Sequence, residues 1–106
     1  GIAAGPAEIK RVATHAVVDM SAWISGCTGL AVSVSDDNKS FREVASKDFP
    51  AETDIRKKAV VDYEITFAPV KTRYVKVTIK RTPTLPEGHP GEGRTPFLFI
   101  DEIVVE

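Results

Sequence analysis

The stretch Val61-Asp62-Tyr63-Glu64-Ile65-Thr66-Phe67 alternates apolar and polar side chains, and this alternation decides the fold class. Successive side chains of a β-strand point to opposite faces, so a period of two is typical of a strand with one buried face. Pro69 is expected to end this strand, because proline donates no hydrogen bond to a sheet. No window of helix length shows a helical apolar period. The chain is therefore predicted to be all-β.

The same period of two recurs on both sides of this strand. It predicts strands over residues 8–19, 30–35 and 74–80 and a last strand over 97–105. Between them, residues 35–39 (Ser-Asp-Asp-Asn-Lys) favour a tight turn, and Phe41 and Val44 resume the apolar face to complete a β-hairpin. Short strands at regular spacing, joined by turns, favour a sandwich or a barrel.

Two segments interrupt this pattern. Residues 46–58 are polar and are expected to form a surface loop with one helical turn, in which the basic run Arg56-Lys57-Lys58 is a solvated face. Residues 82–96 hold four of the seven prolines and three of the seven glycines. This composition blocks helix and central strand, and it predicts a long, constrained loop.

Size and charge narrow the class of protein. The 106 residues suit one domain, which we assign to residues 1–106. Lys and Arg number 14 against 15 Asp and Glu, so no net field attracts nucleic acid or an acidic membrane surface. No apolar run approaches the roughly 20 residues of a membrane span, so no membrane insertion is expected. The lone Cys27 excludes an internal disulfide and is interpreted as a small buried side chain.

Residues that could carry catalysis are few. The two histidines, His15 and His89, lie far apart, and His15 falls within a strand, where a structural role is the simpler interpretation. The pair Asp36-Asp37 is explained by its turn, and Asp101-Glu102 would point to opposite faces of a strand. No phosphate-binding, dinucleotide-binding or nucleophile-elbow motif is present. These observations favour a binding function over an enzymatic one.

The residues suited to ligand binding fall in two predicted connections. Trp23 lies between strands and either exposes its ring for stacking on a sugar or plugs the end of the core. His89 and Arg94 flank Pro90, Gly91 and Gly93 in the long loop. These two side chains either bind a ligand or stabilise the loop through hydrogen bonds.

Several blocks together carry a resemblance to a known family. They are Glu8-Ile9-Lys10-Arg11-Val12, Ala22-Trp23-Ile24, Val32-Ser33-Val34-Ser35-Asp36-Asp37 with Phe41, Arg73-Tyr74-Val75-Lys76-Val77, and His89-Pro90-Gly91 leading to residues 99–105. In this order and spacing, the chain resembles the discoidin-like domain, also called the coagulation factor five/eight type C domain. The form it is similar to stands at the C-terminus of bacterial β-hexosaminidases of glycoside hydrolase family 20.

The resemblance implies a galactose-binding-like jelly-roll β-sandwich that lacks its N-terminal strand, because the segment with which family members begin has no counterpart here. It also implies a secreted, periplasmic or cell-surface bacterial protein. The implied partners are the catalytic domain of the parent enzyme and glycans of the N-acetylhexosamine or galactose type. In the family, an acidic residue at the position of Glu102 joins a structural calcium site, so Glu102 is the one implied metal ligand. No other cofactor is implied.

Our leading hypothesis is a non-catalytic carbohydrate-binding module that holds an enzyme near its substrate. Its expected binding residues are Trp23, His89, Arg94 and Phe97, with Asp101 and Glu102 as weaker candidates. The alternative is a structural or protein-interaction module that packs against a catalytic domain and binds no glycan. The family's tryptophans before His-Pro-Gly and at the last strand are replaced here by Gly88 and Phe97, which favours this alternative.

Overall fold

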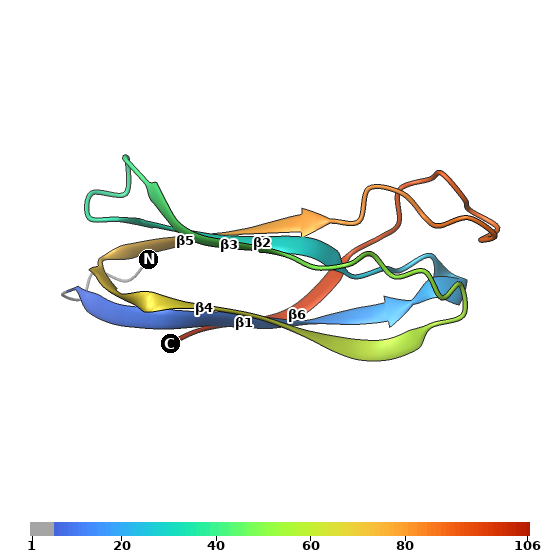
Figure 1. The fold of residues 1–106 in the computed structure, drawn as a ribbon, viewed down its shortest axis with the longest axis horizontal. Coiled ribbons are helices and arrows are strands. Elements are labelled where there is room, and N and C mark those ends of the chain that lie inside the picture. The colour runs from blue at the N-terminus through green and yellow to red at the C-terminus, as the bar shows by residue number, and fades with distance from the viewer. Residues whose placement is uncertain (1–5) are drawn as a thin grey trace.

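The computed structural model describes residues 6–106, which form two antiparallel β-sheets stacked as two layers (Figure 1). The strands are β1 (Ala7–Asp19), β2 (Cys27–Ser35), β3 (Arg42–Asp48), β4 (Lys58–Thr72), β5 (Tyr74–Arg81) and β6 (Phe99–Val105), with a short 3₁₀ helix η1 (Met20–Ala22) after β1. The prediction of an all-β chain is confirmed, and the two layers are compatible with a β-sandwich.

Each sheet has three strands, in the orders β4-β1-β6 and β3-β2-β5. Alternate residues of β1 face the other layer and are buried, as the period of two predicts: Val12, Thr14, Ala16 and Val18. In β2 the corresponding side chains are Leu30, Val32 and Val34. The core therefore lies between the central strands of the two sheets, where burial of apolar surface stabilises the stack.

The β2–β3 hairpin is present as predicted. Its turn is built on Ser35, whose Oγ accepts hydrogen bonds from the backbone N–H groups of Asp37 (3.2 Å) and Asn38 (3.0 Å). Asn38 has a φ of 60°, a left-handed conformation that asparagine tolerates better than most residues. The Ser35 hydroxyl thus satisfies backbone N–H groups of the turn, where the hydrogen-bond ladder between β2 and β3 has ended.

The prediction that Pro69 ends its strand is wrong. Strand β4 continues to Thr72, and the pairing with β1 shifts register, from Arg11 opposite Thr66 to Ile9 opposite Val70. Pro69 lies within this bulge, on the outermost strand of its sheet. An edge strand with a bulge accommodates a proline because the missing N–H has no ladder partner to lose.

Three expected boundaries also move. Strand β3 extends to Asp48 and β4 begins at Lys58, so the loop is 49–57 rather than 46–58. In place of a helical turn it contains a hydrogen-bonded turn in which Lys57 N–H donates to the Asp54 carbonyl at 3.1 Å. The last strand begins at Phe99, and Phe97 instead forms an isolated bridge with Ile24.

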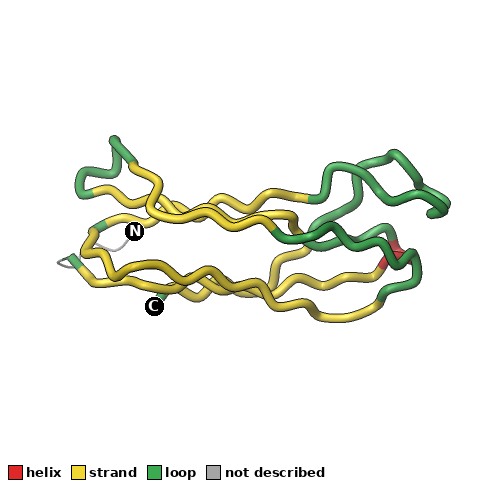
Figure 2. Tube along the Cα trace, in the orientation of Figure 1, coloured by secondary structure: helices red, strands yellow, loops and turns green. Residues whose placement is uncertain are grey.

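The connections separate into two ends of the stack (Figure 2). Residues 20–26, 49–57 and 82–98 gather at one end, which we call the loop end. The hairpin turn, residues 36–41, lies at the opposite end, which we call the turn end. Within residues 6–106, no helix has the length and apolar character needed to cross a membrane.

Candidate functional site

Trp23 occupies a conformationally constrained position at the loop end. It follows η1 with a φ of 63°, and its N–H donates to the Met20 carbonyl at 3.1 Å. A left-handed conformation at a bulky residue costs energy and is retained only where surrounding contacts hold it. Those contacts come from a small cluster of buried side chains, which includes Met20 and Leu85. The indole is half-buried, so it both covers the end of the core and keeps part of its ring accessible.

His89 lies beside this indole but is buried, with an exposed fraction of 5%. Its Nδ1 accepts a hydrogen bond from the Gly91 N–H at 2.9 Å, which leaves Nε2 to donate to the Met20 carbonyl at 2.6 Å. Both ring nitrogens are thus engaged within the protein. The structure places His89 as a link between the 82–98 loop and η1, and it leaves neither nitrogen free for a sugar hydroxyl.

Arg94 also approaches the indole. Its guanidinium carbon lies 6.0 Å from the centre of the Trp23 ring, at the outer limit of a cation–π contact. The backbone around it is well paired, since the Leu85 N–H donates to the Arg94 carbonyl at 2.7 Å and the Arg94 N–H donates to the Gly91 carbonyl at 2.9 Å. The exposed side chain is therefore carried on an ordered loop, with its charge beside the aromatic ring.

Backbone hydrogen bonds join Phe97 to Trp23 and Ser25. The Phe97 N–H donates to the Trp23 carbonyl at 2.8 Å, and the Phe97 carbonyl accepts from the Ser25 N–H at 3.0 Å. Its side chain is 61% exposed and does not line the hollow beside Trp23. Of the four predicted binding residues, the structure thus brings together Trp23, His89 and Arg94 and leaves the Phe97 ring apart.

A hollow of about 360 Å³ lies against Trp23 at the loop end. It is lined by Ser21, Trp23, Ile55, Arg56, Gly88, His89 and Pro90. Arg56 was interpreted as part of a solvated charge run, and sequence spacing contains no signal that would have joined residue 56 to residue 23. The fold joins them because the 49–57 loop and η1 share one end of the stack. An aromatic ring, a guanidinium and a hydroxyl in one hollow can bind a small polyhydroxylated ring.

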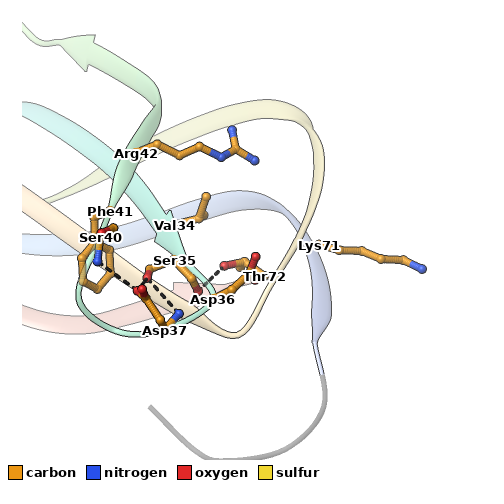
Figure 3. Close-up of a pocket in the computed structure, with 9 residues that line it drawn as sticks. All are labelled: Val34, Ser35, Asp36, Asp37, Ser40, Phe41, Arg42, Lys71 and Thr72. Carbon is orange, nitrogen blue, oxygen red and sulfur yellow. Dashed lines mark hydrogen bonds between the residues drawn. The ribbon is translucent and has the colours of Figure 1, made fainter.

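A second hollow, also of about 360 Å³, lies at the turn end (Figure 3). The carboxylate of Asp37 accepts from the N–H groups of Lys39 and Ser40 and from the Ser35 hydroxyl, all at 2.9 Å. These bonds hold the pKa of Asp37 below its usual value, with those from Ser40 and Lys39 contributing most. The Asp37 carboxylate thus accepts its hydrogen bonds within the turn, whereas the charged ends of Arg42 and Lys71 extend away from the hollow (Figure 3).

A third hollow, of about 320 Å³, contains Cys27, Phe49, Glu52, Asp62 and Tyr63 among its lining residues. Cys27 is buried, as expected for a small apolar side chain, and burial raises the pKa of its thiol. Burial likewise raises the pKa of Tyr63, whose ring packs against Phe49. The raised pKa values favour the neutral Cys27 thiol and the neutral Tyr63 hydroxyl, and both residues belong to the core.

Glu102 and Asp101 are exposed on β6, away from the hollow at Trp23. Calcium takes six to eight oxygen ligands. Within residues 6–106, no group of three or more Asp, Glu, His or Cys side chains gathers in a way that could hold a metal ion. The calcium site that the resemblance implies for Glu102 stays a prediction.

Comparison with known proteins adds no family. A scan against protein-family models finds none that matches this chain, and a search of curated proteins also finds no match.

Proposed function

We propose that this chain is a non-catalytic carbohydrate-binding module of the discoidin-like type, and that its sugar site is the hollow beside Trp23. The observation that carries the proposal is the half-exposed indole fixed in the same hollow as Arg56. Protein sites stack aromatic rings on the apolar face of a sugar, and a guanidinium donates several hydrogen bonds to hydroxyl oxygens.

The dimensions of the hollow favour a short ligand. At about 360 Å³, it lies at the small end of the range for ligand sites, which suits one or two sugar rings. The resemblance directs the choice to N-acetylhexosamine or galactose-type sugars. It also underlies the proposed setting, in which the module stands beside the catalytic domain of a secreted bacterial β-hexosaminidase. Binding would keep that domain near its glycan and raise the local substrate concentration.

Calorimetric titration with N-acetylglucosamine, N-acetylgalactosamine, galactose and chitobiose tests this proposal. The informative variant is Arg56→Ala, because Arg56 is exposed and its backbone N–H bond to Asp54 Oδ1 does not need the side chain. We expect it to weaken binding by about tenfold, as the loss of one charged hydrogen-bond donor does. Arg42→Ala at the turn end is the matched control and should bind as the wild type does. Equal loss in both variants, or no heat from any sugar, would refute the site.

A second function is favoured by a row of exposed apolar side chains. Val17 pairs with Val60 on one side and Phe99 on the other, so these three lie across the outer face of the β4-β1-β6 sheet. All three are exposed. A contiguous apolar row on a sheet face is typical of a docking surface. This arrangement supports the alternative in which the chain packs against a catalytic domain without binding glycan.

The docking function has its own test. The labelled chain is mixed with the catalytic domain of a bacterial β-hexosaminidase, and amide shifts are followed by NMR. Docking predicts amide shifts confined to the row, and these shifts should be lost in Val60→Lys, which places a charge at the most exposed position of the row. Docking through the row is excluded if the shifts are absent or unchanged in that variant.

A further inference from the structure

Strand β6 leaves side chains uncovered on the side that faces the core. In its pairing with β1, Ile103 lies opposite Thr14 and Val105 lies opposite Val12. Directly paired residues share one face of a sheet, and Thr14 and Val12 are buried. Ile103 and Val105 nevertheless expose 47% and 40% of their surface. The opposing layer therefore does not extend far enough to cover β6.

The neighbouring edge strand of the other sheet, β5, also has inward-facing apolar side chains that are not fully covered. Val75, Val77 and Ile79 of β5 pair with buried residues of β2, but they remain only half-buried. The two layers pack closely between β3 and β4 and less closely between β5 and β6. Both β5 and β6 are the last strands of their sheets, so among residues 6–106 neither has a strand partner along its outer edge. Together these two strands form what we call the open flank.

The two strands of the open flank carry opposite charges. The solvent face of β5 presents Lys76 and Lys80, whereas β6 presents Asp101 and Glu102. All four side chains are exposed. Opposite charges across a strand pair are favourable, and like charges are unfavourable. The basic strand β5 and the acidic strand β6 would therefore attract each other if they paired.

The strand directions allow that pairing between two copies. Strand β5 runs toward the loop end and β6 runs away from it (Figure 1), so the two are antiparallel. A two-fold axis parallel to the strands brings the upper layer of one copy level with the lower layer of the other and leaves the strand direction unchanged. Strand β5 of the first copy then lies antiparallel beside β6 of the second, and β6 of the first lies antiparallel beside β5 of the second.

We propose that the open flank is the interface of a symmetric dimer in which β5 of each copy pairs with β6 of the other. Each three-stranded sheet then continues into a sheet of the partner. Both open edges of each copy are used in this pairing, so the assembly stops at two copies. Ile103 and Val105 become covered by apolar side chains of the partner's β5. The alternative two-fold axis, perpendicular to the sheets, would set β6 against β6 and bring carboxylates together, so the charges select the first arrangement.

Sedimentation velocity on the wild-type chain and two charge-reversal variants tests the dimer. The molar mass derived from sedimentation of the wild type should be twice the 11.5 kDa of one chain. Lys76→Glu/Lys80→Glu makes both strands acidic, and Asp101→Lys/Glu102→Lys makes both basic, so each variant alone should be a monomer. An equimolar mixture should dimerise again, because each contact then joins an acidic strand to a basic strand. Glu43→Lys, on the opposite edge strand β3, is the control and should leave the dimer intact.

Restoration in the mixture cannot arise from misfolding of either variant, so it separates the proposal from a simple loss of structure. Circular dichroism of each variant confirms that the strands persist. A wild-type monomer at roughly 1 mM would overturn the proposal. A dimer that survives both charge reversals would overturn it too, because another surface must then hold the copies together.

Discussion

The imidazole of His89 meets the indole of Trp23 edge to face, with ring centroids 5.9 Å apart and the planes at 78°. This geometry is favourable for aromatic pairs, and it joins two connections that are distant in the chain. The buried imidazole also bonds to the Met20 carbonyl and the Gly91 N–H. His89 therefore positions the indole rather than presenting a nitrogen to a ligand.

Replacing His89 should destabilise the domain. His89→Ala leaves the Met20 carbonyl and the Gly91 N–H without their partner, and a buried unpaired group costs about 1 to 3 kcal/mol. Chemical denaturation measures the free energy of unfolding. His15→Ala is the control, because the exposed pairing of His15 with Asp62 is worth little. Equal stability of the two variants would refute the positioning role.

The left-handed backbone at Trp23 predicts an order among its variants. Both Trp23→Ala and Trp23→Gly delete the ring and its contacts with Met20 and Leu85. Only glycine adopts a φ of 63° without a steric penalty, so the glycine variant should be more stable than the alanine variant by about 1 kcal/mol. Thermal unfolding compares the two directly. An alanine variant as stable as the glycine variant would show that the backbone relaxes when the ring is removed.

Gly91 allows close approach of the indole. A Cβ added there would lie 3.0 Å from Cη2 and Cζ3 of Trp23 and 2.8 Å from Cδ1 of Leu85. Gly91→Ala should therefore shift the tryptophan fluorescence and cost about 1 to 3 kcal/mol through overpacking. Gly93→Ala provides the contrast, because a Cβ at Gly93 meets nothing within 4 Å and only its φ of 80° is strained. The prediction fails if Gly91→Ala leaves the fluorescence as unchanged as Gly93→Ala does.

The turn end predicts a pH dependence. Hydrogen bonds from Ser40, Lys39 and Ser35 lower the pKa of Asp37 below its ordinary 3.8. A depressed pKa in the folded state contributes stability above the unfolded pKa, and this contribution is lost as the pH falls through the folded value. Asp37→Ala should thus be less stable than the wild type near neutrality, and the gap should close below pH 3.8. Melting curves across this range test it, with the adjacent exposed Asp36→Ala as control. A gap that persists in acid would show that the carboxylate charge is not its cause.

Much of the fold follows from local pattern. The alternation in residues 61–67 and in β1 and β2 identified buried faces correctly, and in β5 it identified the half-buried face, because a strand with one inward face must repeat every two residues. The end of β4 was predicted wrongly because a bulge on an edge strand accepts Pro69, and neither the bulge nor the edge is visible in local sequence. The uncovered Ile103 and Val105 were equally invisible, since an apolar strand looks the same whether or not a second layer covers it.

The candidate site was only partly predictable. Trp23 and the long loop were identified because a lone tryptophan and a proline-rich connection are distinctive. The roles of His89 and Phe97 depend on which way each side chain turns, and spacing does not determine this. Arg56 was missed because its position beside Trp23 arises from tertiary packing between loops. These are contacts that single-sequence patterns do not encode.

Sugar binding in the hollow beside Trp23 can be observed residue by residue in a two-dimensional NMR titration of the labelled chain. The four sugars named above are added while the Trp23 indole N–H and the amides of residues 55–56 and 88–97 are followed. We expect saturable shifts confined to these signals. Unchanged signals at roughly 50 mM of every sugar, or shifts centred on the turn-end residues 35–42, would contradict it.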